Sequence, residues 1–111
     1  MATWSLVATI KAPEDKVLAF AAHHLAIGCD RLWLYFDDPE APVPEGLMRH
    51  PKVTVTRCDD AYWQTQNKRP PTHQNRQARN ARNTYPQVTS DWLAHVDVDE
   101  FIHTPRPLSD I

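Results

Sequence analysis

Two aspartates separated by a single residue, Asp97 and Asp99, have the clearest potential for chemistry in this sequence. They lie at the end of residues 92–98, whose apolar residues predict a last buried strand. Side chains two residues apart in a strand share a face, so both carboxylates would point the same way. Like charges so close are unfavourable unless a proton or a cation lies between them. Mg²⁺ or Mn²⁺ fits this role, because such ions take a few carboxylate oxygens and complete their shell with water and phosphate oxygens.

The residues around this Asp-x-Asp pair leave several roles open. An isolated pair could simply cap a strand and the turn after it, but the apolar residues on both sides favour the metal site. His95 has the same strand parity as the aspartates, so it could be a third ligand or a hydrogen-bonded core histidine. Glu100 would face away from the pair if the strand continues, and could form a salt bridge with an arginine instead.

A second acidic pair, Asp37 and Asp38, follows the apolar run of residues 32–36. Ligands of open parallel sheets bind at the carboxyl ends of the strands, so both acidic pairs are expected at the same edge of the sheet. One of these two aspartates is expected to be only a turn former before Pro39. Lys11, at the end of the first predicted strand, could approach a phosphate or remain solvated.

Positive charge is concentrated in one part of the chain. Residues 61–90 contain no Asp or Glu, and they contain five basic residues: Lys68, Arg69, Arg76, Arg79 and Arg82. The last three recur every third residue, so they could share one broad face of a helix. Arginine matches phosphate geometry well, although a solvated basic face is the alternative, above all for Arg82. Basic and acidic segments together suit an anionic ligand that binds with a cation.

The pattern of apolar residues predicts four strands and two main helices. The strands are expected at residues 4–10, 32–36, 53–56 and 92–98, and the helices at 13–28 and 73–85. The apolar stripe of the second helix would be Ala78, Ala81 and Tyr85. Residues 39–45 and 58–72 are expected to be loops, with a short helical turn at 46–50. This order predicts a mostly parallel sheet with helices packed on it, the α/β class.

The size and composition of the chain narrow the possibilities. Residues 1–111 fall within the range of a single domain, and no apolar run has the length of a membrane span. The N-terminus lacks the features of a signal peptide, so a cytoplasmic location is the default expectation. The two cysteines, Cys29 and Cys58, are expected to be small reduced core residues.

Three segments, in this order and spacing, resemble family 2-like glycosyltransferases. Residues 91–101 resemble the strand-borne Asp-x-Asp-Glu-Phe motif of that family. Residues 23–32 look like its first helix and second strand, and residues 77–80 are similar to the helix that precedes the motif. The resemblance implies a GT-A-like, Rossmann-like fold. It also implies a nucleotide diphosphate sugar as donor and Mn²⁺ or Mg²⁺ as cofactor.

The resemblance suggests roles for five residues. Asp97 and Asp99 would bind the metal or the ribose, with Asp99 the better candidate for a direct metal ligand. Asp37 or Asp38 resembles the acid that recognises the nucleoside. Arg79, within the segment of residues 77–80, would contact the nucleotide sugar.

The first strand departs from the family pattern. The family usually places an Asn-Glu pair after a basic residue there, whereas Lys11 is followed by Ala12, Pro13 and Glu14. Contacts to the base from this turn are therefore not expected, and Lys11 itself is the residue that could reach the diphosphate.

The implied reaction inverts the anomeric carbon, with a carboxylate general base that deprotonates an acceptor hydroxyl. Family members carry an acceptor-binding half after the Asp-x-Asp strand, and this sequence ends soon after Phe101. The resemblance therefore implies an incomplete fold and a general base outside this sequence. The acceptor, a glycan, lipid or protein, is unknown. Such a chain is expected to bind nucleotide with metal but to transfer little or no sugar alone.

Two other classes of protein remain as alternatives. In a metal-dependent phosphohydrolase, His95, Asp97 and Asp99 would form part of a metal cluster, which would need a further His-Asp pair. In a nucleic-acid-binding module, Tyr62, Trp63 and the five basic residues would grip the nucleic acid. The near-neutral pI of about 6.3 argues against that module, so no nucleic-acid partner is predicted.

Overall fold

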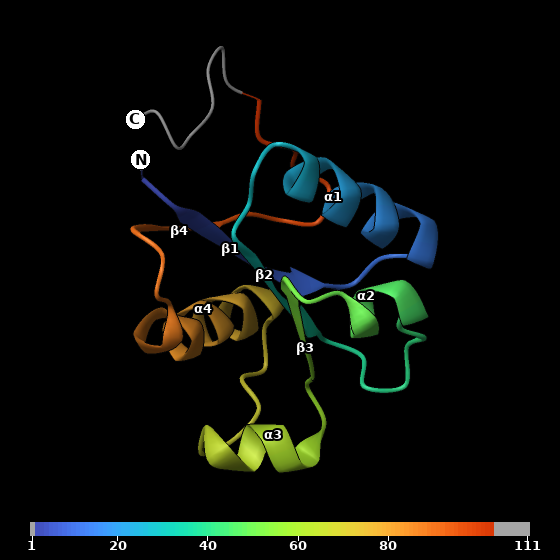
Figure 1. Ribbon diagram of the computed structural model, residues 1–111. Helices are drawn as coiled ribbons and strands as arrows, with labels where there is room; N and C mark the ends of the chain where they lie inside the picture. The colour runs from blue at the N-terminus through green and yellow to red at the C-terminus, as the bar shows by residue number, and fades with distance from the viewer. Residues whose placement is uncertain (1, 104–111) are drawn as a thin grey trace.

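A single parallel sheet forms the centre of the computed structural model, which describes residues 2–103 (Figure 1). Its strands are β1 (Trp4–Ile10), β2 (Arg31–Phe36), β3 (Val53–Arg57) and β4 (Trp92–His95). They lie in the order β3-β2-β1-β4, and every neighbouring pair is parallel. The prediction of the α/β class with a parallel sheet is therefore confirmed, and the arrangement is compatible with a Rossmann-like fold.

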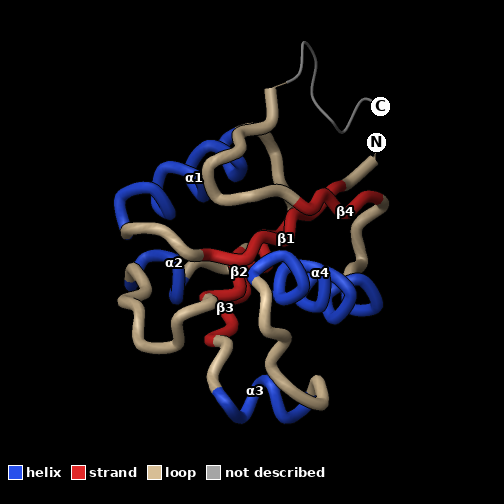
Figure 2. Tube along the Cα trace, turned by 180° about the vertical axis from the view of Figure 1, so that it is seen from behind, coloured by secondary structure: helices blue, strands red, loops and turns tan. Residues whose placement is uncertain are grey.

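Helices cover both faces of this sheet, so the molecule has three layers. The chain forms α1 (Glu14–Ala26), α2 (Glu45–Arg49), α3 (Asp60–Thr65) and α4 (His73–Thr84), followed by the short 3₁₀ helix η1 (Tyr85–Gln87). Helices α1 and α4 lie on opposite sides of the strands, as the view from behind also shows (Figure 2). No helix among the described residues combines the length and the apolar character needed to span a bilayer.

The layer between α1 and the sheet is an ordinary apolar core. Phe20 of α1 is fully buried against the alternate side chains of the central strands, such as Leu6 of β1 and Leu34 of β2. Every residue of β1 is buried, as expected for a central parallel strand with helices on both faces. Pro13 precedes α1 and Gly28, with φ of 99°, follows it, so the predicted helix is confirmed with its start and stop signals.

The buried face of α4 is polar, which the sequence did not indicate, although an apolar cluster that includes Val7 and Trp63 lies on the same side of the sheet. The buried residues of α4 are Arg76, Asn80 and Thr84, four residues apart along the helix. Asn80 donates its Nδ2–H to Thr9 Oγ1 at 2.9 Å and accepts from the hydroxyl of Tyr62 at 2.6 Å. The predicted helix is therefore present, but the prediction of an apolar packing stripe was wrong for Ala78 and Tyr85, which are both exposed. The third predicted residue, Ala81, is half-buried and packs against the apolar cluster.

Residues 58–72 were predicted to be a loop, and they contain α3 instead. The carboxylate of Asp59 caps this helix by accepting the backbone N–H of Tyr62 at 2.8 Å. The single buried side chain of α3 is Trp63, which is 2% exposed and joins the core on the α4 side of the sheet. A helix of six residues with one buried side chain leaves no periodic pattern in the sequence.

Strand β4 is shorter and more exposed than predicted. It ends at His95 rather than Val98, and it lies at the edge of the sheet, where Trp92 is 55% exposed. Residues 97–100 form a turn in which Glu100 N–H donates to Asp97 O at 2.9 Å. The prediction of a buried strand through Val98 was therefore wrong.

Both cysteines are buried thiols, and neither forms a disulfide. Burial raises the pKa of Cys29 and of Cys58 to about 12, so both thiols are neutral at physiological pH. The prediction that they are small core residues is confirmed.

Candidate functional site

A cavity of about 750 Å³ lies at the carboxyl ends of β1 and β4. Four segments form its walls: the end of β1 with Thr9, Lys11, Ala12 and Pro13; α1 with Lys16 and Ala19; α4 with His73, Gln74 and Gln77; and the chain after β4 with Asp97, Val98, Asp99 and Phe101. Strands β2 and β3 lie on one side of β1, and β4 lies on the other side. The strand order therefore reverses between β1 and β4, where the cavity lies. Open α/β sheets bind ligands at such a switch point. We call this space the switch-point cavity.

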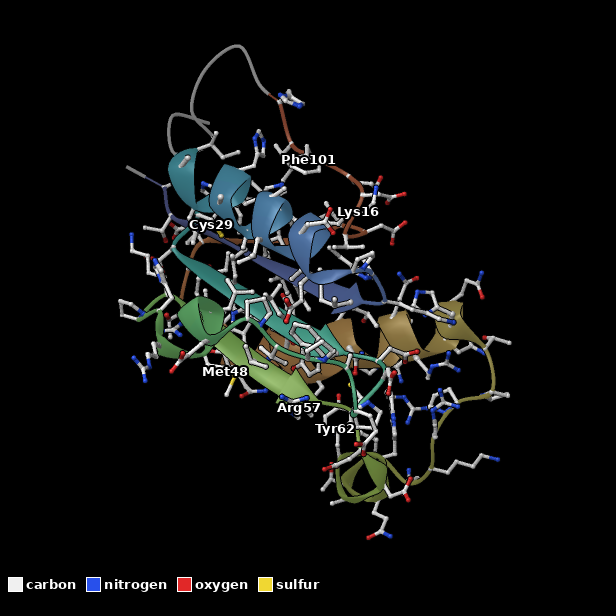
Figure 3. All side chains as sticks on the ribbon, turned by 90° about the vertical axis from the view of Figure 1, so that its right-hand side faces the viewer. Lys16, Cys29, Met48, Arg57, Tyr62 and Phe101 are labelled. Carbon is white, nitrogen blue, oxygen red and sulfur yellow. The ribbon has the colours of Figure 1, made fainter. Side chains whose placement is uncertain are left out.

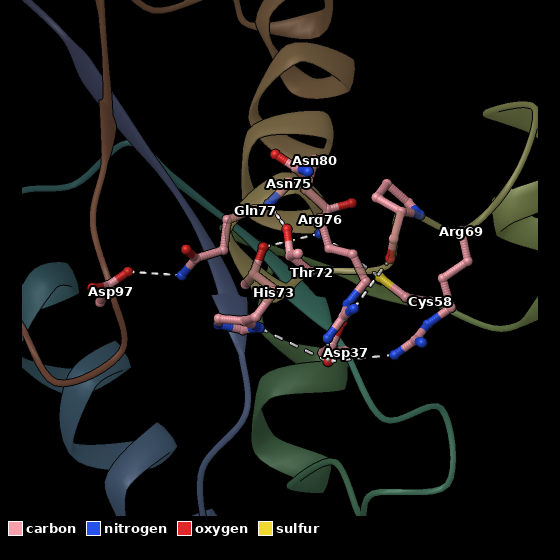
Figure 4. Close-up of polar contacts among 12 residues, drawn as sticks. Asp37, Cys58, Arg69, Thr72, His73, Asn75, Arg76, Gln77, Asn80 and Asp97 are labelled. Carbon is pink, nitrogen blue, oxygen red and sulfur yellow. Dashed lines mark hydrogen bonds and ion pairs between the residues drawn. The ribbon is translucent and has the colours of Figure 1, made fainter.

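Asp97 and Asp99 both line the switch-point cavity, but a turn rather than strand parity brings them there. Both residues are exposed. Asp97 Oδ1 accepts a hydrogen bond from Gln77 Nε2 of α4 at 2.8 Å (Figure 4). The backbone N–H of Asp97 donates to Glu100 Oε1 at 2.7 Å. Glu100 therefore stabilises the turn, and the proposed salt bridge to an arginine does not occur within residues 2–103.

Two histidines of α1 hold the chain that follows this turn. His23 Nε2 donates to Ile102 O at 2.8 Å, and His24 Nε2 accepts the backbone N–H of Ile102 at 3.2 Å. His24 Nδ1 donates to Phe20 O at 2.8 Å, so the fully buried ring must be the neutral Nδ1–H tautomer. Phe101 packs on both histidine rings, with centroids 5.0 Å from His23 and 5.8 Å from His24. Helix α1 thus fixes the segment that carries Asp99, a role that no sequence signal indicated.

This arrangement predicts that acid destabilises the protein through His24. Burial lowers the pKa of His24 below its ordinary value of 6.5. The unfolded chain therefore takes up a proton at a higher pH than the folded chain, and stability is lost as pH falls from 6.5 towards the lowered pKa. Urea unfolding at several pH values between about 5 and 8 should show this fall in the free energy of unfolding. The dependence of the free energy of unfolding on pH should be smaller in His24→Gln and unchanged in His95→Gln, which alters an exposed histidine. Equal pH dependence in the wild type and His24→Gln would contradict this assignment.

Positively charged side chains line the same cavity as the two aspartates. Lys11 at the end of β1 and Lys16 in the first turns of α1 both line it. Figure 3 shows Lys16 on α1 beside the segment that carries Phe101. Within residues 2–103, neither lysine has a carboxylate within 4.0 Å. The cavity therefore offers cations for an anionic ligand together with carboxylates for a metal ion. Lys16 was missed in the sequence because nothing marks which face of a helix borders a cavity.

Asp37 lies in a neighbouring cavity and is engaged by an arginine. This space of about 450 Å³, the Asp37 cavity, is lined by Lys11, Asp37, Asp38, Pro39, Cys58, Asp60, Arg69 and Arg76. Arg76 donates Nε–H to Asp37 Oδ1 at 2.7 Å and Nη2–H to Oδ2 at 3.2 Å (Figure 4). Both residues are 5% exposed. Lys11 lines both cavities, so it links the Asp37 cavity to the switch-point cavity.

Further groups surround the Asp37 carboxylate. Arg69 Nη2 and His73 Nδ1 are each 3.9 Å from Asp37 Oδ2, too far for a hydrogen bond. The buried Nδ1 of His73 has no hydrogen-bond partner within residues 2–103. Asp38 instead accepts the backbone N–H of Glu40 at 2.9 Å. Asp38 is thus the turn former of the pair, whereas Asp37 is buried and paired with Arg76.

The three arginines of α4 do not share one face, contrary to the prediction. A step of three residues turns the helix by about 60°, so Arg76 and Arg82 lie about 120° apart. Arg76 is buried against Asp37, whereas Arg82 is exposed. Arg79 donates to Gln66 O at 2.7 Å and does not line the switch-point cavity, so its predicted contact with the nucleotide sugar lacks support. The arginine at the ligand-binding edge of the sheet is Arg76.

The residues of the switch-point cavity suit some metal sites better than others. Within residues 2–103, no group of three or more His, Cys, Asp or Glu side chains is placed to hold a metal ion. Two carboxylates do fit Mg²⁺ or Mn²⁺, because phosphate oxygens and water normally complete the shell of these ions. His95 is exposed and does not line the cavity, so it is neither a core histidine nor a third ligand there. The metal cluster of a phosphohydrolase is therefore not supported.

The structure also weakens the alternative of a nucleic-acid-binding module. The ring of Trp63 is buried, and the hydroxyl of Tyr62 donates to Asn80 in the layer beneath α4. Neither ring is free to stack on a base. Arg76, one of the five basic residues, is committed to Asp37.

Comparison of the chain with protein-family models, with curated proteins and with solved structures finds no match. The functional argument therefore depends on the residues that line the two cavities.

Proposed function

We propose that the protein is a metal-dependent glycosyltransferase whose switch-point cavity binds the diphosphate of a nucleotide sugar with Mn²⁺ or Mg²⁺. The main support is one observation: a single cavity at the switch point of a parallel sheet is lined both by Asp97 and Asp99 and by Lys11 and Lys16. The resemblance of residues 91–101 to the Asp-x-Asp motif agrees with this proposal. The sugar would be transferred, with inversion, to an acceptor hydroxyl.

The two aspartates would have different roles in this site. Asp97 is already held by Gln77 at 2.8 Å, which orients its carboxylate. Asp99 is exposed in the cavity and is the better candidate for a direct metal ligand. When bound, the cation would offset the negative charge that develops on the departing nucleoside diphosphate.

The basic and acidic residues near β1 and β2 would hold the rest of the nucleotide. Lys11 and Lys16 are placed to contact phosphate oxygens in the switch-point cavity. Asp37 would recognise the nucleoside from the adjoining cavity, and Arg76 would orient its carboxylate through two hydrogen bonds. Lys11, which lines both cavities, would lie where the nucleoside and the diphosphate meet.

Calorimetric titration with nucleoside diphosphates, with and without Mn²⁺, tests the proposal. Binding to the wild type is expected to depend on Mn²⁺, and Asp99→Asn should weaken it by roughly 10- to 100-fold through the loss of a metal contact. Asp30→Asn is a matched control, since Asp30 is exposed beside the opposite, amino end of β1. This control should bind like the wild type.

Two results would count against the proposal. Nucleoside diphosphate binding that is equal with and without Mn²⁺, or unchanged in Asp99→Asn, would exclude the metal site at this turn. Tight, salt-sensitive binding to RNA that survives Asp99→Asn would favour the nucleic-acid-binding module instead.

A further inference from the structure

A basic groove lies between α4 and the loop that precedes it, and it shares no lining residue with either cavity. It has a volume of about 250 Å³, and its lining includes Lys68, Pro70, Asn75, Arg79 and Arg82. Asn75, Arg79 and Arg82 of α4 recur at positions i, i+4 and i+7, so they share one face of the helix. The loop of residues 66–71, between α3 and α4, forms the opposite wall. We call this space the Arg82 groove.

The positive charge of this groove is not balanced by nearby acids. Within residues 2–103, Lys68, Arg79 and Arg82 have no carboxylate within 4.0 Å. The sequence has no Asp or Glu from residue 61 to residue 90, so neither α4 nor the loop can supply one. The other two basic residues of this stretch, Arg69 and Arg76, instead face Asp37. Three positively charged side chains, Lys68, Arg79 and Arg82, therefore line one small groove.

Backbone and side-chain contacts hold the walls of the groove in place. Arg79 is half-buried, and its Nη1–H donates to Gln66 O at 2.7 Å. Gln66 Nε2 also donates to Asn83 Oδ1 of α4 at 3.2 Å, which ties the loop to the helix a second time. Asn67 has φ of 80°, a left-handed conformation that turns the chain just before Lys68. Arg79 and the loop wall of the groove are thus positioned before any ligand binds.

We infer that the Arg82 groove is a second anion site, which binds the phosphate group of a small phosphorylated molecule. Guanidinium groups match phosphate oxygens with two parallel hydrogen bonds, and the lysine adds a point charge. Three uncompensated cations suit a multiply charged phosphate better than a single carboxylate. No aromatic side chain lines the groove among the described residues, so it offers no surface on which the bases of a nucleic acid could stack.

The Arg82 groove is distinct from the proposed nucleotide-sugar site because different sides of α4 form them. Gln74 and Gln77 line the switch-point cavity, and Arg76 is buried on the Asp37 cavity. Arg79 and Arg82 line neither of these cavities. An anion held by Arg82 therefore binds without Asp97 or Asp99, and its binding requires no metal ion.

NMR titration with inorganic pyrophosphate, in the presence of EDTA, tests this site. Saturable shift changes are expected at residues 68–82, including the side-chain N–H signals of Arg79 and Arg82. Arg82→Gln removes charge-assisted hydrogen bonds without altering a buried residue, and it should weaken binding about tenfold. Lys68→Gln is a second variant, with an effect in the same direction. Arg49→Gln removes an exposed arginine of α2 as a matched control and should change nothing.

Each alternative outcome of the titration is informative. Shift changes confined to Lys11 and Lys16, or equal weakening by Arg82→Gln and Arg49→Gln, would overturn the second site. Absence of saturable binding in the wild type would do the same. An RNA oligonucleotide that binds more tightly than pyrophosphate, and loses its affinity in Arg82→Gln, would replace the small phosphorylated ligand by a nucleic acid. A thermal unfolding curve confirms that Arg82→Gln is folded, and Lys68→Gln provides the test if it is not.

Discussion

Replacing Arg76 by Met is expected to lower the free energy of unfolding by about 3–5 kcal/mol, because it leaves the Asp37 carboxylate buried without its main partner. Asp37 is 5% exposed, and Arg76 supplies the two hydrogen bonds that satisfy its oxygens. Arg69 and His73 are each 3.9 Å away and can replace only part of this interaction. Total stabilities of small domains are about 5–15 kcal/mol, so the variant would be close to unfolding.

A double-mutant cycle measures how much of this loss of stability comes from the unpaired, buried carboxylate of Asp37. Urea unfolding of Arg76→Met, Asp37→Asn and the double variant gives the coupling energy of the pair. The double variant should be more stable than Arg76→Met alone, since it contains no unpaired buried charge. Arg49→Met, which breaks an exposed pair with Glu45, is the control and should cost at most about 1 kcal/mol. A loss below about 1 kcal/mol in Arg76→Met would mean that water or Arg69 satisfies Asp37.

Phe20→Ala is also expected to cost about 3–5 kcal/mol, as is typical for loss of a buried aromatic ring. Phe20 is fully buried between α1 and the sheet, and its ring centroid is 4.5 Å from that of His24 and 6.1 Å from that of Phe101. The variant therefore opens a cavity beneath the contacts that hold the chain after Asp99. Besides lower stability in urea, we expect faster hydrogen exchange at the Ile102 amide, which donates to His24.

Leu18→Ala provides the matched control for this prediction. Leu18 is on the same helix but is 44% exposed, so its truncation should cost less than about 1 kcal/mol. Phe20→Leu retains part of the apolar volume and should show the same exchange effect to a smaller degree if Phe20→Ala does not fold. Unchanged exchange at Ile102 in both Phe20 variants would show that α1 does not secure the Asp99 segment.

The strands and the main helices were predictable because their residues carry local signals. The apolar runs of β1 and β2, with β-branched residues in β1, predicted buried parallel strands, and Pro13 and Gly28 marked the ends of α1. The end of β4 was misplaced because the alternation of Val and Asp after His95 suits a strand and a turn equally well. The hydrogen bond from Asp97 N–H to Glu100 that selects the turn is a side-chain contact without a sequence signature.

The candidate site was predicted in part, and the errors in that prediction have a common cause. Asp97, Asp99 and Lys11 were correctly expected at one edge of the sheet, because parallel strands place their carboxyl ends together. The pairing of Asp37 with Arg76 joins residues 39 positions apart, and nothing in the local sequence distinguishes Arg76 from Arg79. The choice depends on which face of α4 is buried. That face is polar, so a search for apolar periodicity could not find it.

The polar contacts beneath α4 differ from the apolar core beneath α1 in their response to cooling. Apolar burial weakens on cooling, since its driving force near room temperature is mainly entropic. The hydrogen bonds that join Asn80 to Thr9 and Tyr62 do not depend on this driving force. Cooling is therefore expected to weaken the packing of Phe20 more than the hydrogen bonds of Asn80.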